Sequence, residues 1–175
     1  PRFPPEPRKP RFAFANQLRV GVPKDPFFMD ADYKALYEQV LQSMVAAWDV
    51  ELVPIDMGAL DAVAQHLYTG PWLAERFITA QNCLARNVPG LDPTVKGIVS
   101  KGKDFSACDA FAAFYEVRQQ ALHAAGIWQL VDVLLVPTAP GLPRYADVQA
   151  DPVGVNSALG RYTNFVNLLG WSALS

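Results

Sequence analysis

The sequence predicts an α/β fold in which helices sandwich a mostly parallel or mixed sheet. Apolar stretches at residues 18–22, 50–55 and 131–136 have the length and β-branched content of strands. Segments with apolar residues at three- and four-residue spacing lie between these stretches, as expected for amphipathic helices. Because strands that alternate with helices usually form parallel sheets, we expect residues 17–175 to form one α/β unit.

The first half of the chain has the order strand, helix, strand. The expected first strand, Leu18 to Val22, leads into a loop, and Asp30 or Asp32 can then cap a helix by accepting hydrogen bonds from its first amides. Apolar residues recur from Tyr33 to Val45 at helical spacing, which predicts a strongly amphipathic helix. Val50 to Ile55 is predicted as a second strand, parallel to the first.

A helical region from Met57 is interrupted by Gly70 and Pro71. We predict helices over residues 60–68 and from residue 72 to about residue 86. Gly70 suits the end of the first helix, and Pro71 suits the first position of the second, because no amide donor is needed there.

The second half is expected to contain further helices and the most apolar strand. A short helix is predicted at residues 93–100, and residues 106–109 resemble a capping box that opens a long helix. Residues 131–136 are expected to be a strand buried on both faces, because they are largely apolar. A last helix should run from residue 156 to about residue 169, with the start of a fourth strand after Gly170.

Composition excludes several classes of partner. The chain is 51% hydrophobic and 18% charged, with a formal net charge of −2 and an isoelectric point near 5.6, so it has no basic field to attract nucleic acid or a membrane surface. No run approaches the roughly 18 consecutive apolar residues of a membrane span, and the N-terminus lacks the apolar core of a signal peptide. We expect a cytoplasmic protein.

Both ends resemble cut points. Residues 1–16 are expected to be an extended, proline-rich connector, since such a segment packs little. The chain begins at Pro1 and ends on largely apolar residues, so we expect it to be a proteolytic fragment, a truncation or a natural half of a longer protein. Cys83 and Cys108 lie in predicted helices without ligand spacing and are expected to be free, buried thiols.

No residue has the sequence context of a catalytic nucleophile. Serine catalysis needs a hydroxyl beside a base, usually in a tight glycine-containing turn, and Ser157 fits the start of a helix better. The histidines have no carboxylate at a suggestive spacing, and phosphate-binding glycine patterns are missing. We therefore predict no catalytic residue in this chain, no metal ligand and no cofactor.

Tyr68 and Arg76 flank the Gly70–Pro71 break and are the best candidates for binding a small carboxylate. Arg76 can be a solvated surface arginine paired with Glu75 or with a loop acid. Alternatively, its planar guanidinium can hold a carboxylate or carbamoyl oxygen while Tyr68 donates a second hydrogen bond. In one continuous helix the two residues would lie about 12 Å apart along the axis and about 80° apart around it, but the break can bring them together.

Residues 162–167 mix polar and aromatic side chains on a predicted helix. Simple amphipathic packing would bury Phe165 in the core. The amides of Asn164 and Asn167 lie among apolar neighbours and should need specific hydrogen bonds. We therefore predict Thr163 and Asn164 as supporting residues of a pocket.

Several of these stretches resemble the later part of the amidase signature family. This resemblance is carried by Leu18–Pro23, Asp132–Pro140 and Gly160–Leu168, of which the first two are shared broadly across the family. Two further features look more narrowly like the allophanate hydrolase branch: Gly70–Trp72 with Glu75–Arg76, and Asp151–Pro152 leading to Asn156–Ser157, Leu159–Gly160 and Tyr162–Phe165. The resemblance covers nearly everything from Leu18 to the end.

The resemblance implies an incomplete amidase-signature fold in residues 17–175 and a role in amide hydrolysis. In that family a serine nucleophile, a cis-serine and a lysine lie in a glycine- and serine-rich region that this sequence lacks, so no catalytic residue can be carried over. Allophanate hydrolases clamp the substrate carboxylate with a tyrosine and an arginine that match Tyr68 and Arg76.

The implied whole enzyme hydrolyses allophanate to ammonia and carbon dioxide through an acyl-enzyme, as in bacterial urea degradation. Its expected partners are a small carboxylated amide and the missing catalytic segment or chain, and a homo-oligomer is left open. A general amidase of other specificity and a non-catalytic binding or partner module remain alternatives.

Overall fold

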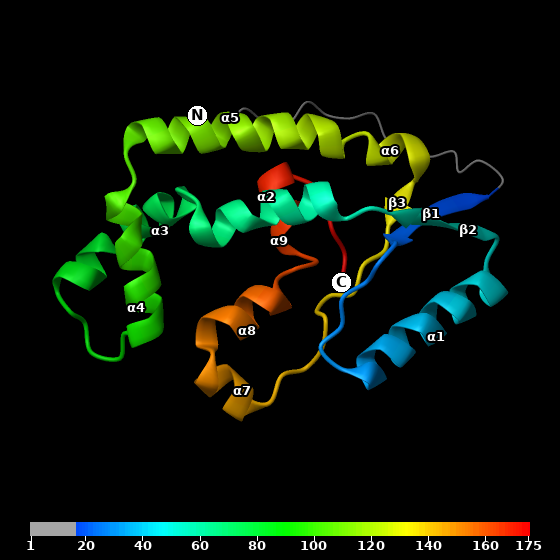
Figure 1. Cartoon of the computed structure of the whole chain (residues 1–175), viewed down its shortest axis with the longest axis horizontal. Coiled ribbons are helices and arrows are strands. Elements are labelled where there is room, and N and C mark those ends of the chain that lie inside the picture. The colour runs from blue at the N-terminus through cyan, green and yellow to red at the C-terminus, as the bar shows by residue number, and fades with distance from the viewer. Residues whose placement is uncertain (1–16) are drawn as a thin grey trace.

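The computed structural model describes residues 17–175, except for the side chains of residues 68 and 69, and confirms the predicted α/β fold (Figure 1). Its 3-stranded sheet has the order β2-β1-β3, formed by β1 (Leu18–Pro23), β2 (Val50–Ile55) and β3 (Val133–Leu134). β1 pairs in parallel with both neighbours. The connector predicted at residues 1–16 lies outside the described residues and stays a prediction.

Helices make up most of the remaining described chain. They are α1 (Ala31–Ala47), α2 (Gly58–Thr69), α3 (Trp72–Ala85), α4 (Pro93–Ser100), the 3₁₀ helix η1 (Lys101–Asp104), α5 (Ala107–Ala124), α6 (Ile127–Leu130), α7 (Tyr145–Ala150), α8 (Pro152–Leu159) and α9 (Asn164–Leu169). Figure 1 shows the long α5 running beside α2, while α1 lies away from them beyond the sheet. The sequence did not predict the short helices α6 and α7.

Two hydrophobic cores lie on opposite faces of the sheet. The larger one is built from α2, α5 and α9 and includes Leu60 and Phe165. The smaller one joins Val20 and its neighbours in the sheet to α1. Consecutive residues Leu134 and Leu135 pack against different cores, because successive side chains of an extended segment point to opposite faces. Helices therefore cover both faces, as predicted.

The helix ends follow the predicted capping chemistry. Asp30 caps α1, where its Oδ1 accepts a hydrogen bond from the Tyr33 amide at 2.7 Å. The capping box of α5 is present: the Asp109 amide donates to Ser106 Oγ at 3.1 Å, and the Ser106 amide donates to Asp109 Oδ2 at 2.8 Å. Gly70 ends α2, as predicted, whereas Pro71 stands just before the first residue of α3.

Helix α1 is less deeply packed than its amphipathic pattern predicts. None of its residues is buried, and Leu36 is 56% exposed. Leu41 and Met44 contact the smaller core, and the Tyr37 hydroxyl donates a hydrogen bond to the Leu135 carbonyl at 3.2 Å. The helix is therefore attached to the sheet along a narrow stripe.

The third strand is shorter and more exposed than predicted. Only Val133 and Leu134 pair as a strand, and Val133 is 41% exposed rather than buried on both faces. The reason is position: within the described residues β3 is an edge strand with β1 as its one partner. The apolar composition predicted the element but not its place in the sheet.

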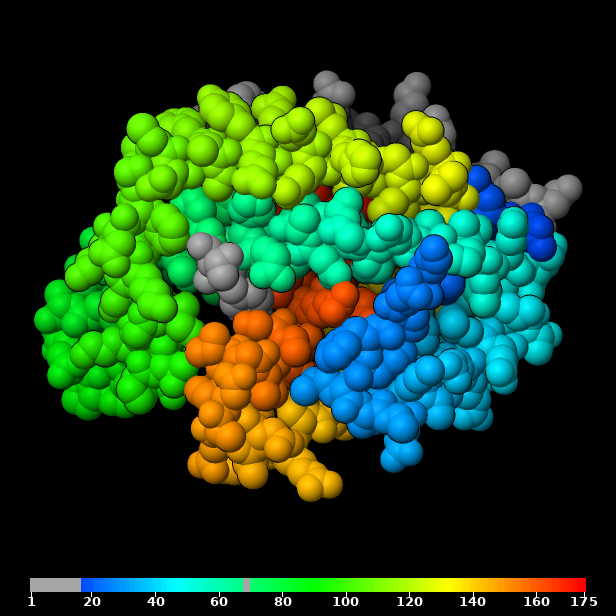
Figure 2. Space-filling view, in the orientation of Figure 1, coloured from blue at the N-terminus to red at the C-terminus, as the bar shows by residue number. Residues whose placement is uncertain are grey.

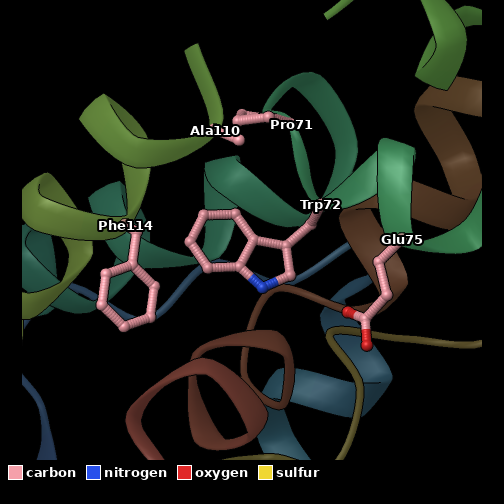
Figure 3. A pocket seen from close by; sticks show the side chains of 5 residues that line it. All are labelled: Pro71, Trp72, Glu75, Ala110 and Phe114. Atoms are coloured by element: carbon pink, nitrogen blue, oxygen red, sulfur yellow. The ribbon is translucent and has the colours of Figure 1, made fainter. Parts of the chain in front are cut away.

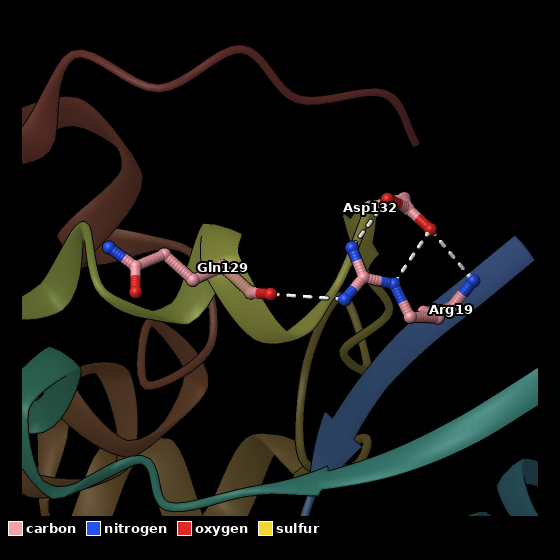
Figure 4. Close-up of polar contacts among 3 residues, drawn as sticks. All are labelled: Arg19, Gln129 and Asp132. Atoms are coloured by element: carbon pink, nitrogen blue, oxygen red, sulfur yellow. Dashed lines mark hydrogen bonds and ion pairs between the residues drawn. The ribbon is translucent and has the colours of Figure 1, made fainter. Parts of the chain in front are cut away.

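An arginine–aspartate pair holds the start of this edge strand to β1 (Figure 4). Asp132 Oδ2 accepts hydrogen bonds from the Arg19 amide at 2.9 Å and from its Nε at 3.3 Å, and Asp132 Oδ1 accepts from Nη2 at 2.9 Å. Arg19 Nη1 also donates to the Gln129 carbonyl at 3.0 Å. The side-chain hydrogen bond between Arg19 and Asp132 lowers the pKa of Asp132 and raises the pKa of Arg19.

The C-terminal region corrects two predictions. The helix expected over residues 156–169 is divided into α8 and α9 by a turn, and a Cβ at Gly160 would overlap the Asn164 side chain. Glycine thus permits the close approach at which the chain changes direction. Residues 171–175 form no strand; the Trp171 ring instead packs against Trp128, with ring centroids 4.7 Å apart.

The cysteines are free, as predicted, but they are not buried. Cys83 and Cys108 are both exposed. Each lies on an outward-facing side of its helix, which apolar composition alone does not reveal.

Truncation of Leu60 should destabilise the larger core. Leu60 is fully buried, so Leu60→Ala removes apolar contacts and leaves a cavity that costs about 3 kcal/mol of unfolding free energy. Urea denaturation followed by tryptophan fluorescence measures the change. Leu142→Ala is the matched control, because Leu142 is 78% exposed. Equal losses in the two variants would contradict this core assignment.

Ionisation of Tyr37 should lower the free energy of unfolding at high pH. Burial raises the pKa of Tyr37 to about 12, while an unfolded tyrosine ionises near about 10. Because the pKa is higher in the folded state, the neutral phenol contributes stability that is fully present below about pH 10. This stability is lost as the pH rises through about 12. Urea denaturation should show the wild-type unfolding free energy falling more steeply across this window than that of Tyr37→Phe. Parallel pH profiles would refute the assignment.

Candidate functional site

A cavity of about 490 Å³ lies where the helices meet the loop between β1 and α1. Figure 2 shows the teal α2 and the orange α8 on the same face of the molecule. The polar lining residues are Asp61, Gln65, Lys101, Ser157, Arg161 and Asn164, and the apolar ones are Phe27, Ala64, Leu73, Ile98, Val153 and Ala158. The lining thus carries two basic groups and one acid on largely apolar walls.

Close packing of η1 on α3 brings Lys101 to this cavity. Gly102 is buried, and a Cβ there would overlap the Leu73 carbonyl and crowd Phe77. Only glycine lets the two backbones approach this closely. Lys101 comes directly before Gly102 in η1, and Leu73 is an α3 residue that Gly102 contacts. Both Lys101 and Leu73 line the cavity.

Asp61 and Arg161 form an ion pair in the cavity wall. Arg161 Nη2 donates to Asp61 Oδ2 at 2.7 Å, and the side chains are 38% and 29% exposed for arginine and aspartate. Burial raises the pKa of Asp61 above its ordinary value, and the charge and hydrogen bond of Arg161 offset only part of this rise. The pair fixes the Arg161 side chain and leaves its remaining donors for other groups.

The neighbouring Tyr162 joins the cavity to the loop after β1. Tyr162 is almost fully buried, and its hydroxyl accepts a hydrogen bond from the Phe27 amide at 2.7 Å and donates one to the Phe27 carbonyl at 2.9 Å. The Arg161 guanidinium carbon lies 5.3 Å from the centroid of the Phe27 ring, within cation–π range. Burial raises the pKa of Tyr162, so the phenol stays neutral and can donate.

The structure separates the predicted pocket residues Thr163 and Asn164. Asn164 lines the cavity, whereas Thr163 is exposed and its hydroxyl donates to the Gly160 carbonyl at 3.4 Å. Both residues lie at the turn between α8 and α9 rather than inside one continuous helix. Their contribution to substrate binding stays a prediction.

Arg76 is exposed on α3, about one helical turn beyond Leu73. Arg76 is not among the residues that line the cavity, although Leu73, three residues earlier on the same helix, does line it. No hydrogen bond or ion pair joins Arg76 to another side chain in the part of the chain that the structure describes, including Glu75. The predicted helix break is present, but the Tyr68 side chain lies outside the described residues. The clamp stays a prediction.

A second hollow of about 310 Å³ lies on the other side of α3 (Figure 3). It is lined by Pro71, Trp72, Glu75, Ala110 and Phe114, so it is mainly aromatic with one carboxylate. The Trp72 ring also meets the edge of His66, with centroids 5.8 Å apart. This hollow offers apolar contact but no nucleophile.

Sequence reasoning missed most of the cavity. Asp61 and Arg161 are 100 residues apart, and nothing local signals that they pair. Ser157, interpreted as the start of a helix, lies inside α8, which begins at Pro152 and is capped by Asp151, and it lines the cavity. The one usable signal was the polar run after Gly160, which the prediction reduced to Thr163 and Asn164.

The described helices include none that is both long enough and apolar enough to cross a membrane.

The chain belongs to the amidase family, a family of amide hydrolases whose sequence pattern matches residues 2–175. Among individual proteins it is similar to the urea amidolyases of Lachancea kluyveri and Saccharomyces cerevisiae. The chain is 35% identical to the first, over 98% of this chain and 10% of that protein. It is 33% identical to the second, over 93% of this chain and 9% of that protein. A 2-amino-5-chloromuconic acid deaminase from Comamonas testosteroni is 28% identical over 90% of this chain and 35% of its own length.

Solved structures agree with this assignment. Allophanate hydrolase from Kluyveromyces lactis superposes with a TM-score of 0.83 at 34% identity, over 89% of this chain and 26% of that one. The urea amidolyase of the same yeast gives a TM-score of 0.83 over 89% of this chain and 10% of that one. The chain thus spans about a tenth of the urea amidolyases that it matches.

The cavity acid should titrate above the ordinary aspartate range. Its raised folded-state pKa means that Asp61 contributes stability at low pH that is lost as the pH rises through that pKa. Carbon-13 NMR of the carboxyl group should show the raised value. Arg161→Ala should raise it further, because Arg161 favours the charged form. A lower value in Arg161→Ala would contradict the ion pair.

Proposed function

We propose that this chain is the substrate-recognition part of an amidase that hydrolyses allophanate to ammonia and carbon dioxide. The observation that carries the proposal is the exposed Arg76 on α3, shortly after the Gly70–Pro71 break, which forms no ion pair with another side chain in the part of the chain that the structure describes. The similarity to an allophanate hydrolase and to urea amidolyases supports this choice of substrate. Such a function would belong to cytoplasmic urea degradation.

The proposed chemistry divides the work between two segments. A serine outside the described residues attacks the terminal amide carbon, ammonia leaves, and the resulting acyl-enzyme is hydrolysed by water. This chain supplies the other part: Arg76 and Tyr68 hold the substrate carboxylate, and Thr163 and Asn164 support the pocket. Holding the far end of a small substrate places its amide at the nucleophile and reduces the entropy still to be lost in the transition state.

The electrostatics of the cavity favour an anionic substrate. Lys101 and Arg161 line it with one compensating acid, Asp61, so the lining has an excess of one positive charge. Water exclusion by the apolar walls strengthens attraction to a carboxylate. A guanidinium can also hold a carboxylate through two parallel hydrogen bonds, which fixes the orientation of the substrate.

An amidase of another specificity is the second candidate. The similarity to a 2-amino-5-chloromuconic acid deaminase favours it, because that relative matches 90% of this chain. A non-catalytic binding module is the third alternative. Comparison of allophanate with simple amides as substrates of the full-length protein separates these functions.

Loss of the Arg76 guanidinium should impair allophanate hydrolysis in the full-length enzyme. We expect Arg76→Ala to lower kcat/KM by roughly 30- to 1,000-fold, which corresponds to about 2 to 4 kcal/mol for a truncated charge-assisted pair. The loss should be much smaller for an amide without a carboxylate, because that substrate never uses the anchor. Steady-state kinetics with the two substrates measure the difference.

Arg86→Ala is the matched control, since Arg86 is an exposed arginine just past the end of α3 opposite to the Gly70–Pro71 break. Arg76→Lys should recover only part of the activity, because an ammonium group lacks the planar fork. Unchanged kcat/KM for allophanate in Arg76→Ala would defeat the assignment.

A further inference from the structure

We infer that Phe27 sets the size of amide that the cavity accepts and that Tyr162 is the residue that positions it. This inference rests on the proposed amidase function and concerns a different part of the cavity from the Tyr68–Arg76 clamp. Phe27 lies in the loop between β1 and α1 and is the one residue of that loop that lines the cavity.

The backbone of Phe27 is held from the opposite end of the chain. The Tyr162 hydroxyl accepts a hydrogen bond from the Phe27 amide at 2.7 Å and donates one to the Phe27 carbonyl at 2.9 Å. One phenol therefore satisfies both backbone groups of Phe27. Tyr162 is 1% exposed, and little movement is open to a ring packed in the core. Phe27 is therefore fixed relative to the turn between α8 and α9.

The side chain of Phe27 is held by a second contact. The Arg161 guanidinium carbon lies 5.3 Å from the ring centroid, and Asp61 fixes that guanidinium through a 2.7 Å hydrogen bond. Phe27, Asp61 and Arg161 all line the cavity. The aromatic ring thus forms a wall whose position is set by two neighbouring residues, Arg161 and Tyr162.

The rest of the loop is anchored away from the cavity. The adjacent Phe28 packs against Tyr37, with ring centroids 5.5 Å apart, and the Met29 amide donates to the Pro140 carbonyl at 2.8 Å. Gly141 allows this approach, because a Cβ there would crowd Asp30 and Met29. On the other side of Phe27, the Lys24 amide donates to the Ile55 carbonyl at 2.9 Å. Since both flanks are held, the loop cannot withdraw Phe27 without breaking these contacts.

Phe27 is 40% exposed, and displacing its ring breaks the contact with Arg161, so this aromatic wall discriminates by size. A small planar amide leaves the ring in place, whereas a bulky acyl group must displace it and break the contacts of Phe27. Removal of the ring should therefore admit larger amides, and loss of the Tyr162 hydroxyl should loosen the wall without removing it.

The test uses the full-length enzyme that contains this chain, with acetamide and benzamide as small and bulky substrates. Phe27→Ala should raise the ratio of kcat/KM for benzamide to that for acetamide by about tenfold, the scale of discrimination that apolar pocket contacts provide. Tyr162→Phe keeps the buried ring, and it should raise the ratio by about threefold, mainly through a lower KM for benzamide. Phe27→Leu provides a milder truncation if the alanine variant folds poorly.

Two matched controls separate positioning from general stability. Trp128→Ala removes a packed aromatic ring that does not line the cavity and does not contact the loop, and Tyr37→Phe removes a hydroxyl that binds a different backbone carbonyl. Both should lower Tm without moving the substrate ratio. Equal ratios in wild type, Phe27→Ala, Phe27→Leu and Tyr162→Phe would overturn the inference while the amidase function stands. A wild-type enzyme that hydrolyses no amide overturns the proposed function and this inference together.

Discussion

Parallel pairing on both sides of β1 is the constraint on which the rest of the structure depends. β1 lies between β2 and β3 in the sheet, and parallel neighbours cannot be joined by tight hairpins. The chain must therefore leave the sheet after each strand, and the long connections become helices that cover its faces. The loop that follows β1 carries Phe27, so the strand order also decides which residues can reach the cavity.

The cavity is assembled by contacts between distant parts of the chain. Tyr162 binds Phe27 across 135 residues, and Arg161 binds Asp61 across 100. These partners are partly buried, where an unpaired polar group would cost more than it does in water. The same contacts that shape the cavity therefore also hold α2, the loop after β1 and the α8–α9 turn together.

The sequence predicted what local chemistry decides. The capping box at Ser106 and the break at Gly70 involve residues within a few positions of each other, and both were predicted. Strand 131–136 was recognised from its apolar residues, but its short pairing and the exposed Val133 follow from an edge position that no local pattern encodes. The Asp61–Arg161 pair was missed for the same reason, whereas the amidase resemblance already linked residues near Arg161 to function.

The contact between Arg19 and Asp132 has a consequence for the packing of both cores. β3 has only a two-residue ladder, flanked by main-chain hydrogen bonds from the Asp132 amide to the Arg19 carbonyl at 2.9 Å and from the Leu135 amide to the Gly21 carbonyl at 2.8 Å. The Asp132 carboxylate reinforces this alignment, because it binds both the main chain and the side chain of Arg19. A slip of one residue would exchange Leu134 and Leu135 between the larger and the smaller core. A polar contact at the edge of the sheet thus selects which leucine enters which hydrophobic interior.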